Sequence, residues 1–316
     1  MKLRTASPAD LDEIVELMRC SLGEGTVPRT KDFFQWKHFD NPFGRSPILL
    51  AEDGGRLVGL RAFLRWELRA PGRTYRAVRA VDTATHPDFR GRGIFKRLTL
   101  ELVRRMCDER VDFVFNTPNE KSGPGYRKMG WVEVGSIPVW VRPGLGFAHR
   151  FFDEAKGQLD DRECSALRRA AASDVPSEWA RKDFEDRAHT PRDARYLRWR
   201  YVDVPGIDYG AAYDPARYLI VFRRRVRRGL RETTVCELLV APSRRARAAA
   251  FGALLRLATR AEVVTCAASA SLAMNRALRL SSLRLAGPML MSRELASSPV
   301  EGFARWGWSL GDLELF

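Results

Sequence analysis

The chain of 316 residues, 45% hydrophobic and 29% charged, has the composition of a packed globular protein and the length of one large domain or two ordinary ones. No apolar run reaches the roughly 18 residues that a membrane-spanning helix needs, and the first residues lack the apolar core of a signal peptide. The five cysteines are scattered, odd in number and never in a Cys-x-x-Cys pair, which argues against a disulfide framework and a zinc site and predicts a cytoplasmic protein.

The chain carries a net charge of +15, and its sign bears on the choice of partners. The 54 lysines and arginines are spread along the sequence and do not gather in a basic helix interleaved with aromatic residues. We therefore interpret them as solvated surface and expect neither nucleic acid nor a membrane as partner. A polyanion such as a phosphorylated cofactor is the alternative that the charge leaves open. The densest cluster, residues 223–229, lies between two apolar runs and predicts an exposed hairpin turn.

Strand and helix signals alternate along the first half of the chain. Period-two and period-3.6 patterns, with Gly and Pro as punctuation, define the elements. The predicted elements are a strand at 2–6, helices at 8–22 and 31–39, strands at 48–51, 57–68 and 74–85, a helix at 93–110, a strand at 111–116, a short helix at 125–128 and a strand at 132–141.

The Pro-Gly-Leu-Gly segment at 143–146 interrupts this pattern and predicts a domain boundary. We expect a first domain at 1–145 and a second at 146–316, with a helical linker at the start of the second. Residues 36–42 and 199–205 share Trp, Asp and Pro in register, and each block precedes a predicted hairpin and then an apolar helix. The two halves are therefore predicted to be a diverged duplication.

Residues 83–95, Thr-Ala-Thr-His-Pro-Asp-Phe-Arg-Gly-Arg-Gly-Ile-Phe, have the pattern that points most directly to chemistry. A strand ends here, a loop holds two alternate glycines, and a long helix begins. Unpaired amides at a helix N-terminus bind anions, and glycine lets the backbone approach phosphate oxygens without a Cβ. The segment predicts a pyrophosphate-binding strand, loop and helix, although such glycines also occur in ordinary turns that start helices.

This segment resembles motif A of the GNAT acyltransferase superfamily, whose loop reads (Arg/Gln)-x-x-Gly-x-(Gly/Ala). Arg90, Gly93 and Phe95 occupy the three specified positions, and Phe95 departs from the usual Gly or Ala. The resemblance implies an acyl-CoA, most simply acetyl-CoA, as cofactor. The residues that it implies for cofactor binding are Thr83, Ala84, Thr85, Arg90, Gly91, Arg92, Gly93, Ile94, Phe95 and Asn119.

A second match follows downstream, where Asn119, Tyr126 and Gly130-Trp131 are similar to the family's Asn-x6-Tyr-x3-Gly-(Phe/Trp) motif. The resemblance covers about residues 1–142, with a weaker echo in the remainder. It implies an α/β (α+β) fold of two GNAT-like domains, each a central mixed, mostly antiparallel twisted sheet flanked by helices. In such folds the motif A strand splays from its neighbour and opens a slot for the pantetheine arm.

The resemblance also assigns catalytic roles. Tyr126 matches the family's proton donor to the departing thiolate, and its ordinary alternative is an aromatic of the core beside Trp131. Asp82 lies on the motif A strand, where many members carry a carboxylate that acts as base through a water, and we rank it above His86. For Asn119 the ordinary alternative is a helix N-cap.

The aromatic segment at 33–39 lies where GNAT proteins build the wall of the acceptor site. Phe34, His38 and Phe39 are predicted to contact the acceptor, whereas Trp36, with its twin Trp199, is predicted to pack in the core. The acceptor is expected to be a small amine whose identity the sequence leaves open.

The second half has Arg-Ala-Arg-Ala at 245–248, so both glycines of the loop are alanine, and Asn275 is followed seven positions later by Ser282. We expect a degenerate GNAT-like domain that does not bind CoA and that completes the acceptor pocket. One active site per chain follows, and a monomer with pseudo-dimeric domains is consistent with it.

The leading hypothesis is an acyl-CoA-dependent N-acyltransferase that moves an acetyl or other acyl group to an amine by direct attack in a ternary complex. One alternative is a Fem-like transferase that uses aminoacyl-tRNA, which the positive charge suits and the glycine loop does not. The other is a non-catalytic acyl-CoA-binding protein.

Overall fold

The structure is a computed structural model that describes residues 1–23, 28–144, 146, 159–173, 175, 179, 187–227, 229–267, 283–297 and 305–313. The first half contains β1 (Lys2–Thr5), α1 (Leu11–Leu22), α2 (Lys31–His38), β2 (Ile48–Asp53), β3 (Arg56–Ala70), β4 (Arg73–Thr85), α3 (Ile94–Asp108), β5 (Phe113–Asn116), α4 (Gly123–Lys128) and β6 (Val132–Pro143). The predicted elements of this half are confirmed, with ends that differ by a few residues.

The second half contains α5 (Asp161–Ala172), β7 (Ala188–His189), α7 (Ala194–Leu197), a π-helical turn at Arg198–Val202, β8 (Gly210–Asp214), β9 (Tyr218–Arg227), β10 (Leu230–Val240), α8 (Arg244–Thr259), β11 (Val263–Ala267), β12 (Leu283–Glu294) and β13 (Trp306–Gly307). Most of the predicted helical linker, together with Asn275 and Ser282, lies outside the described residues. The turn predicted at 223–229 starts later than expected, because residues 223–227 belong to β9. None of the helices in the described ranges combines the length and the apolar composition that a bilayer crossing requires.

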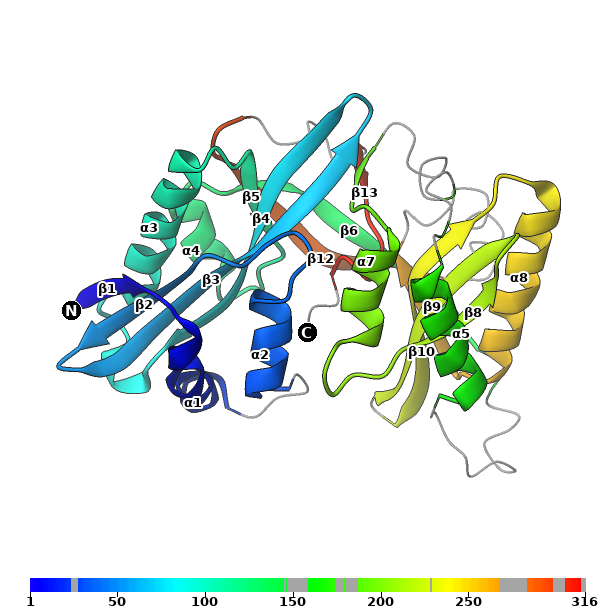
Figure 1. The fold of residues 1–316 in the computed structure, drawn as a ribbon, viewed down its shortest axis with the longest axis horizontal. Coiled ribbons are helices and arrows are strands. Elements are labelled where there is room, and N and C mark those ends of the chain that lie inside the picture. Colours follow the sequence, from blue (N-terminus) through cyan, green and yellow to red (C-terminus); the bar gives the residue numbers. More distant parts are fainter. Residues whose placement is uncertain are drawn as a thin grey trace.

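A single mixed sheet runs through the molecule in the order β1-β2-β3-β4-β5-β12-β6-β11-β10-β9-β8 (Figure 1). Most neighbouring strands are antiparallel, and β4–β5 and β10–β11 are parallel pairs. This mixed α/β architecture, a large sheet flanked by helices, confirms the predicted fold class.

The central strands β6 and β12 join the two halves. β12 comes from beyond the predicted boundary, yet it pairs with β5 and β6 in the first half, and β6 in turn pairs with β11 in the second half. Each half therefore contains a strand contributed by the other. The two-domain division at 145/146 stays a prediction, and the exchanged strands make the halves interdependent whatever the boundary.

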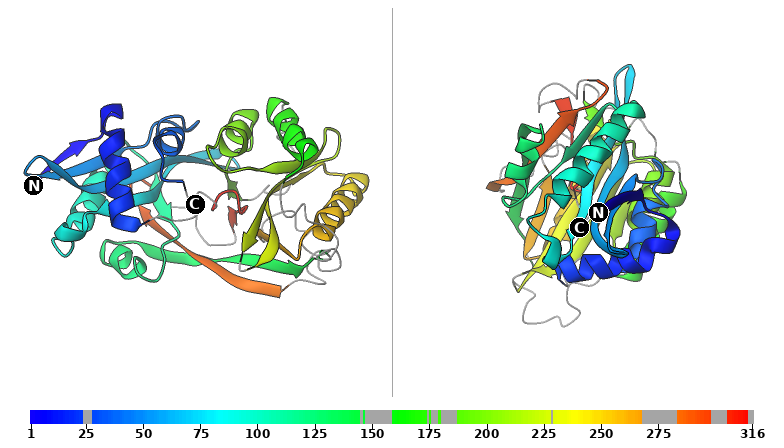
Figure 2. Two further views of the ribbon diagram at one scale, coloured as in Figure 1. Left: turned by 90° about the horizontal axis from the view of Figure 1, so that it is seen from below. Right: turned by 90° about the vertical axis from the view of Figure 1, so that its left-hand side faces the viewer.

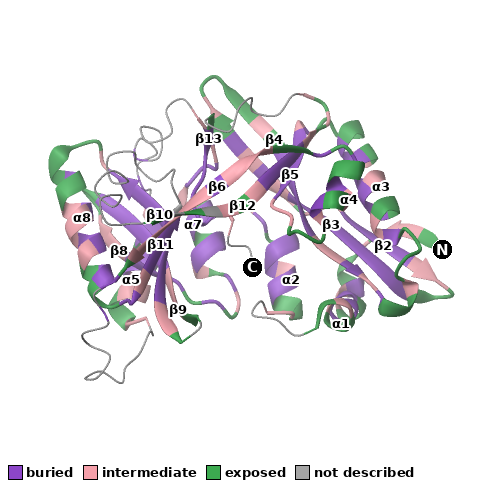
Figure 3. Cartoon of the chain, turned by 180° about the vertical axis from the view of Figure 1, so that it is seen from behind, coloured by how far each residue is buried: buried purple, intermediate pink, exposed green. Residues whose placement is uncertain are grey.

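Helices cover both faces of the sheet (Figure 2). One face carries α1, α2, α5 and α7 over a core that runs through both halves, whereas α3 and α4 cover a second core and α8 a third on the opposite face. The strands are largely buried between these layers, and exposed residues gather on the outer sides of the helices (Figure 3). Burial on both faces explains why β3 is apolar over most of its length.

A reciprocal contact between Trp36 and Trp199 supports the predicted duplication. Their rings stack with centroids 5.1 Å apart, and each indole donates to the other's backbone carbonyl, at 2.7 and 3.0 Å. Neighbouring residues repeat the pattern, since His38 bonds to Asp82 on β4 at 2.7 Å and Tyr201 bonds to Glu237 on β10 at 2.8 Å. Equivalent residues making equivalent contacts are what an internal two-fold relation produces.

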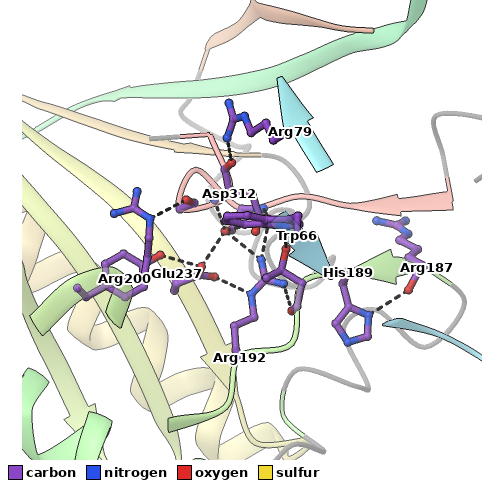
Figure 4. A network of polar contacts seen from close by, with 12 residues as sticks. Trp66, Arg79, Arg187, His189, Arg192, Arg200, Glu237 and Asp312 are labelled. Carbon is purple, nitrogen blue, oxygen red and sulfur yellow. Dashed lines mark hydrogen bonds and ion pairs between the residues drawn. The ribbon is translucent and has the colours of Figure 1, made fainter. Parts of the chain in front are cut away.

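A buried polar network in the second half fixes the C-terminal segment, as Figure 4 shows. Arg192 donates to Glu237 at 3.0 Å and to Asp312 at 2.8 Å, and all three side chains are at most 1% exposed. The two carboxylates raise the pKa of Arg192 against the opposing effect of burial. Arg79 of β4 donates to the backbone carbonyl of Asp312, so the network also reaches the first half.

Replacing Arg192 by methionine is expected to destabilise the fold by about 3–5 kcal/mol, because two buried carboxylates lose their shared cation. Urea unfolding followed by circular dichroism measures this. The control is Arg198→Met, which removes the cation of the Arg198–Asp203 pair, 69% and 48% exposed, and should change stability by less than about 1 kcal/mol. If both substitutions lower the free energy of unfolding equally, the buried ion pairs of Arg192 stabilise the fold no more than the exposed Arg198–Asp203 pair does.

Candidate active site

The loop between β4 and α3 has the backbone that its glycines predict. Gly91 and Gly93 adopt φ angles of +77° and +72°, which side-chain-bearing residues rarely adopt. Apart from the adjoining residues, no atom of the described part of the chain lies within 4 Å of where a Cβ of either would stand. Gly93 is the N-cap of α3, so no side chain covers the first amides of that helix. The result is an open, concave stretch of backbone at a helix N-terminus, which suits an anion such as a pyrophosphate.

The side chains of the same loop are engaged elsewhere. Arg90 donates to the backbone carbonyl of Ser21 at 2.8 Å, and the Arg92 guanidinium lies 4.6 Å from the centre of the Phe89 ring, although both arginines remain exposed. Ile94 points into the core with 2% exposure. The backbone of this loop, more than its side chains, therefore forms the candidate phosphate cradle.

A glycine on a neighbouring strand lets the helix approach the sheet. A Cβ at Gly59 of β3 would stand 2.5 Å from the Ile94 side chain and 3.1 Å from that of Leu98. The absence of a side chain at Gly59 thus lets the N-terminal part of α3 pack closely on β3, a role that the sequence did not indicate.

Strands β4 and β5 separate where the sequence predicted a slot. They pair from Ala77–Phe113 to Arg79–Phe115, after which β4 continues to Thr85 paired with β3 on its other side. Ala84 is buried in the core, and the backbone N–H and C=O of Thr85 are both bonded to the Ser21 hydroxyl of α1, at 3.2 and 2.9 Å. Thr83 and Ala84 thus lie on the part of β4 beyond its pairing with β5, whereas both backbone groups of Thr85 are already bonded to α1.

A β-bulge turns Asp82 toward the α1–α2 face. Arg61 opposes Thr83 and Ala62 opposes Val81, which leaves Asp82 as the extra residue of β4. Bulges often re-aim one side chain next to active sites. Here the bulge places the Asp82 carboxylate among residues of α1 and α2.

The Asp82 carboxylate binds two groups of α2. Lys37 lies 2.8 Å and His38 2.7 Å from the same oxygen, and the other His38 nitrogen lies 2.9 Å from the Ser46 hydroxyl. Burial would raise the pKa of Asp82, but the Lys37 ammonium and the His38 hydrogen bond lower it overall; burial also lowers the pKa of His38. These contacts favour the ionised form of Asp82, whose carboxylate is held between Lys37 and His38.

Tyr126 lies on the opposite face of the sheet, packed between Phe95 and Trp131 at ring distances of 5.6 and 5.1 Å. Phe95, the departure from the family pattern, thus fills the space beside Tyr126. Arg61, which is 1% exposed, donates to the Tyr126 hydroxyl at 2.7 Å and to the Val81 carbonyl at 2.9 Å. The oxygen of Tyr126 is held by this donor next to β4, and its hydrogen is left to be donated to another group.

Arg61 is the functional candidate that the sequence analysis missed. It is the one charged residue in the apolar stretch 57–64, a signal that could have singled it out. A buried arginine whose guanidinium lies over the Phe95 and Tyr126 rings, at 5.5 Å from each centre, fixes the tyrosine in place.

Asn119 occupies an exposed position at the start of α4. Its side-chain oxygen accepts from the backbone amide of Ser122 at 2.9 Å and from the Ser122 hydroxyl at 3.0 Å. These bonds close the turn that precedes α4, whose N-cap residue is Ser122, so Asn119 is not the N-cap of the helix. Asn119 thereby fixes the turn that leads to Tyr126.

A pocket of about 120 Å³ lies between α1, α2 and the bulge of β4. Its lining is mostly apolar and ends at charged groups: Val15, Met18, Leu22, Pro28, Arg29, Thr30, Phe33, Phe34, Lys37 and Asp82. Of the predicted acceptor contacts, Phe34 lines the pocket. The other two, His38 and Phe39, are not among the described residues that line the pocket. His38 is bonded to Asp82, and the Phe39 ring lies next to the Arg45 guanidinium.

The equivalent place in the second half is closed. The N-terminus of α8 is capped by Ser243, whose hydroxyl accepts from the Ala246 amide at 3.0 Å, and Ala246 is buried. Glu237, the counterpart of Asp82, bonds to Arg192 and to Ser309 of the C-terminal segment. The second half thus has neither an open helix N-terminus nor an open carboxylate at these positions.

Residues 2–134 match the family model described as an acetyltransferase (GNAT) domain. No curated protein sequence matches the chain. Solved structures share the fold at low identity. A probable N-acyltransferase from Enterococcus faecalis is 12% identical, with a TM-score of 0.65 over 93% of this chain and 73% of its own.

Two further structures extend the comparison. A GCN5-related N-acetyltransferase from Anabaena variabilis is 13% identical, with a TM-score of 0.66 over 93% of this chain and 72% of its own. Another from Kribbella flavida is 17% identical, with a TM-score of 0.64 over 93% of this chain and 71% of its own. The fold likeness therefore extends over both halves of this chain.

Proposed function

We propose that the protein transfers an acyl group, most simply acetyl, from coenzyme A to the amine of a small molecule, since residues 2–134 match the model of the GNAT acetyltransferase domain. The observation that carries the proposal is the open backbone of Gly91 and Gly93 at the uncapped N-terminus of α3, next to the diverging edge of β4. These features fit a pyrophosphate followed by an extended arm.

In this proposal, residues on one face of the sheet bind the acceptor, and residues on the other face donate the proton to the leaving group. The amides of residues 91–94 would hold the pyrophosphate, and the free edge of β4 would pair with the pantetheine arm as an added strand does. Acetyl-CoA would supply the reactive thioester. Asp82 would attract the acceptor's ammonium group on the α1–α2 face, and Tyr126 would donate a proton to the leaving sulfur from the α3–α4 face.

The second half would support the site without a second cofactor. Its loop at 245–248 has alanines in place of the two glycines. The carboxylate of Glu237, the counterpart of Asp82, accepts a hydrogen bond from Ser309 of the C-terminal segment. We propose that it stabilises the first half through the exchanged strands β6 and β12, so that one chain carries one active site.

Isothermal titration of the purified protein with acetyl-CoA, followed by a thiol-release assay across primary amines, tests the proposal. We expect micromolar binding, in the range usual for enzyme substrates, and acceptor-dependent release of CoA. Salt-sensitive tRNA binding without affinity for acetyl-CoA would replace the proposal by the aminoacyl-transferase alternative. Acetyl-CoA binding without transfer to any amine would favour a non-catalytic binding protein.

A further inference from the structure

The pocket between α1 and α2 is lined by an arginine, Arg29, that has one buried donor atom left unsatisfied by the described residues. The Nη1 atom of Arg29 is fully buried in the pocket wall and, among the described residues, has no hydrogen-bond partner. A buried donor left unpaired is unfavourable, and each such group in a native structure calls for an explanation. A bound anion would satisfy it.

Among the described residues, no carboxylate pairs with Arg29. Lys37 lies 2.8 Å from the Asp82 carboxylate, which also accepts from His38 at 2.7 Å, so the one carboxylate that lines the pocket is already engaged. The Arg29 guanidinium is thus left to bind an anion. Thr30, the N-cap of α2, also lines the pocket, so the positive end of that helix dipole adds to the attraction for an anion.

The remaining wall is apolar and small. Val15, Met18, Leu22, Phe33 and Phe34 supply aliphatic and aromatic surface around about 120 Å³. A cavity of about 150 Å³ is known to hold benzene, so this one accommodates a side chain of the size of leucine or methionine and excludes an indole. A polycationic amine would meet both the Arg29 guanidinium and an apolar wall.

We propose that the acceptor is a free amino acid with a compact apolar side chain, whose carboxylate binds Arg29 and whose amine lies at the Asp82 end of the pocket. This inference rests on the proposed acyl transfer. The reaction forms an amide C–N bond and breaks the thioester C–S bond. The ammonium group loses two protons in total, one taken up by the leaving sulfur and one released to solvent.

Kinetics with leucine and leucinamide separate the carboxylate from the rest of the acceptor. We expect kcat/KM for leucine to exceed that for leucinamide by about tenfold or more, since a site built to bind an anion is left with an unpaired cation when the anion is missing. Tryptophan and glutamate should be poor acceptors because of size and charge. Leucinamide acetylated as well as leucine would overturn the proposal.

Substitution of Arg29 by glutamine ties this preference to the residue. In the Arg29→Gln variant the preference for leucine over leucinamide should disappear, while the Kd for acetyl-CoA stays unchanged and so reports an intact fold. The matched control is Arg19→Gln on the exposed side of α1, which should keep the preference.

Two outcomes separate the inference from the proposed function. A protein that binds acetyl-CoA but acetylates other amines and no amino acid, or whose Arg29→Gln variant keeps the leucine preference, overturns the inference alone. A protein that fails to bind acetyl-CoA overturns the proposed function and, with it, the inference.

Discussion

Replacing Gly93 by aspartate is expected to abolish acetyl-CoA binding. Gly93 is the N-cap of α3, and the space around it is open, so a new side chain would stand at the helix N-terminus, where the pyrophosphate is proposed to bind. A carboxylate about 4 Å from a phosphate charge costs about 4 kcal/mol at an effective dielectric constant of about 20, which corresponds to a loss of about 1000-fold in affinity. Isothermal titration calorimetry measures the change.

The control for this prediction is Gly72→Asp in the turn between β3 and β4. Gly72 has a φ of +70° and equally open surroundings, so the substitution introduces the same backbone strain and the same charge away from the loop. Acetyl-CoA affinity of the Gly72→Asp variant should equal that of the unaltered protein. If Gly93→Asp weakens binding no more than Gly72→Asp does, the pyrophosphate does not bind at the α3 N-terminus.

The first half of the fold could be predicted from the sequence because its signals are local. Helical spacing in residues 94–108 and the paired Gly54 and Gly55 of the β2–β3 turn, at φ angles of +57° and +77°, depend on near neighbours alone. The glycine loop was predictable for the same reason, since its function depends on backbone conformations that glycine adopts most readily.

The interior of the candidate site could not be predicted, because its contacts join residues far apart in sequence. Arg61 meets Tyr126 65 positions later, and Lys37 meets Asp82 across the layer between α2 and β4. The exchange of β6 and β12 is another long-range feature, since an apolar strand carries no mark of the sheet it will join. Resemblance to a family indicated Tyr126 and Asp82, but only the structure shows their partners.

Helix α1 connects the two parts of the proposed site. Ser21 at its C-terminal end binds the backbone of Thr85 and receives a hydrogen bond from Arg90, while Val15 and Met18 line the acceptor pocket. The glycine loop and the proposed acceptor pocket are thus joined through one helix.

Replacing Tyr126 by phenylalanine is expected to lower kcat by about 10²–10⁴-fold, the contribution usual for a general acid, with little change in the Kd for acetyl-CoA. The variant keeps the ring, and hence the contacts with Phe95 and Trp131. It loses only the hydroxyl that Arg61 holds beside β4. Steady-state kinetics with a saturating acceptor measures kcat.

The Tyr126→Phe substitution also leaves a donor of Arg61 without its partner, which can lower stability independently of any effect on catalysis. Loss of its partner costs about 1–3 kcal/mol of stability, so the unfolding free energy of the Tyr126→Phe variant is measured alongside kcat. Tyr213→Phe on the edge strand β8 makes the same chemical change far from the site and should leave kcat unaltered. A fully folded Tyr126→Phe variant with a kcat within threefold of the unaltered protein would exclude Tyr126 as proton donor. Water would then be the remaining proton source for the leaving sulfur, and Arg61 would serve the core alone.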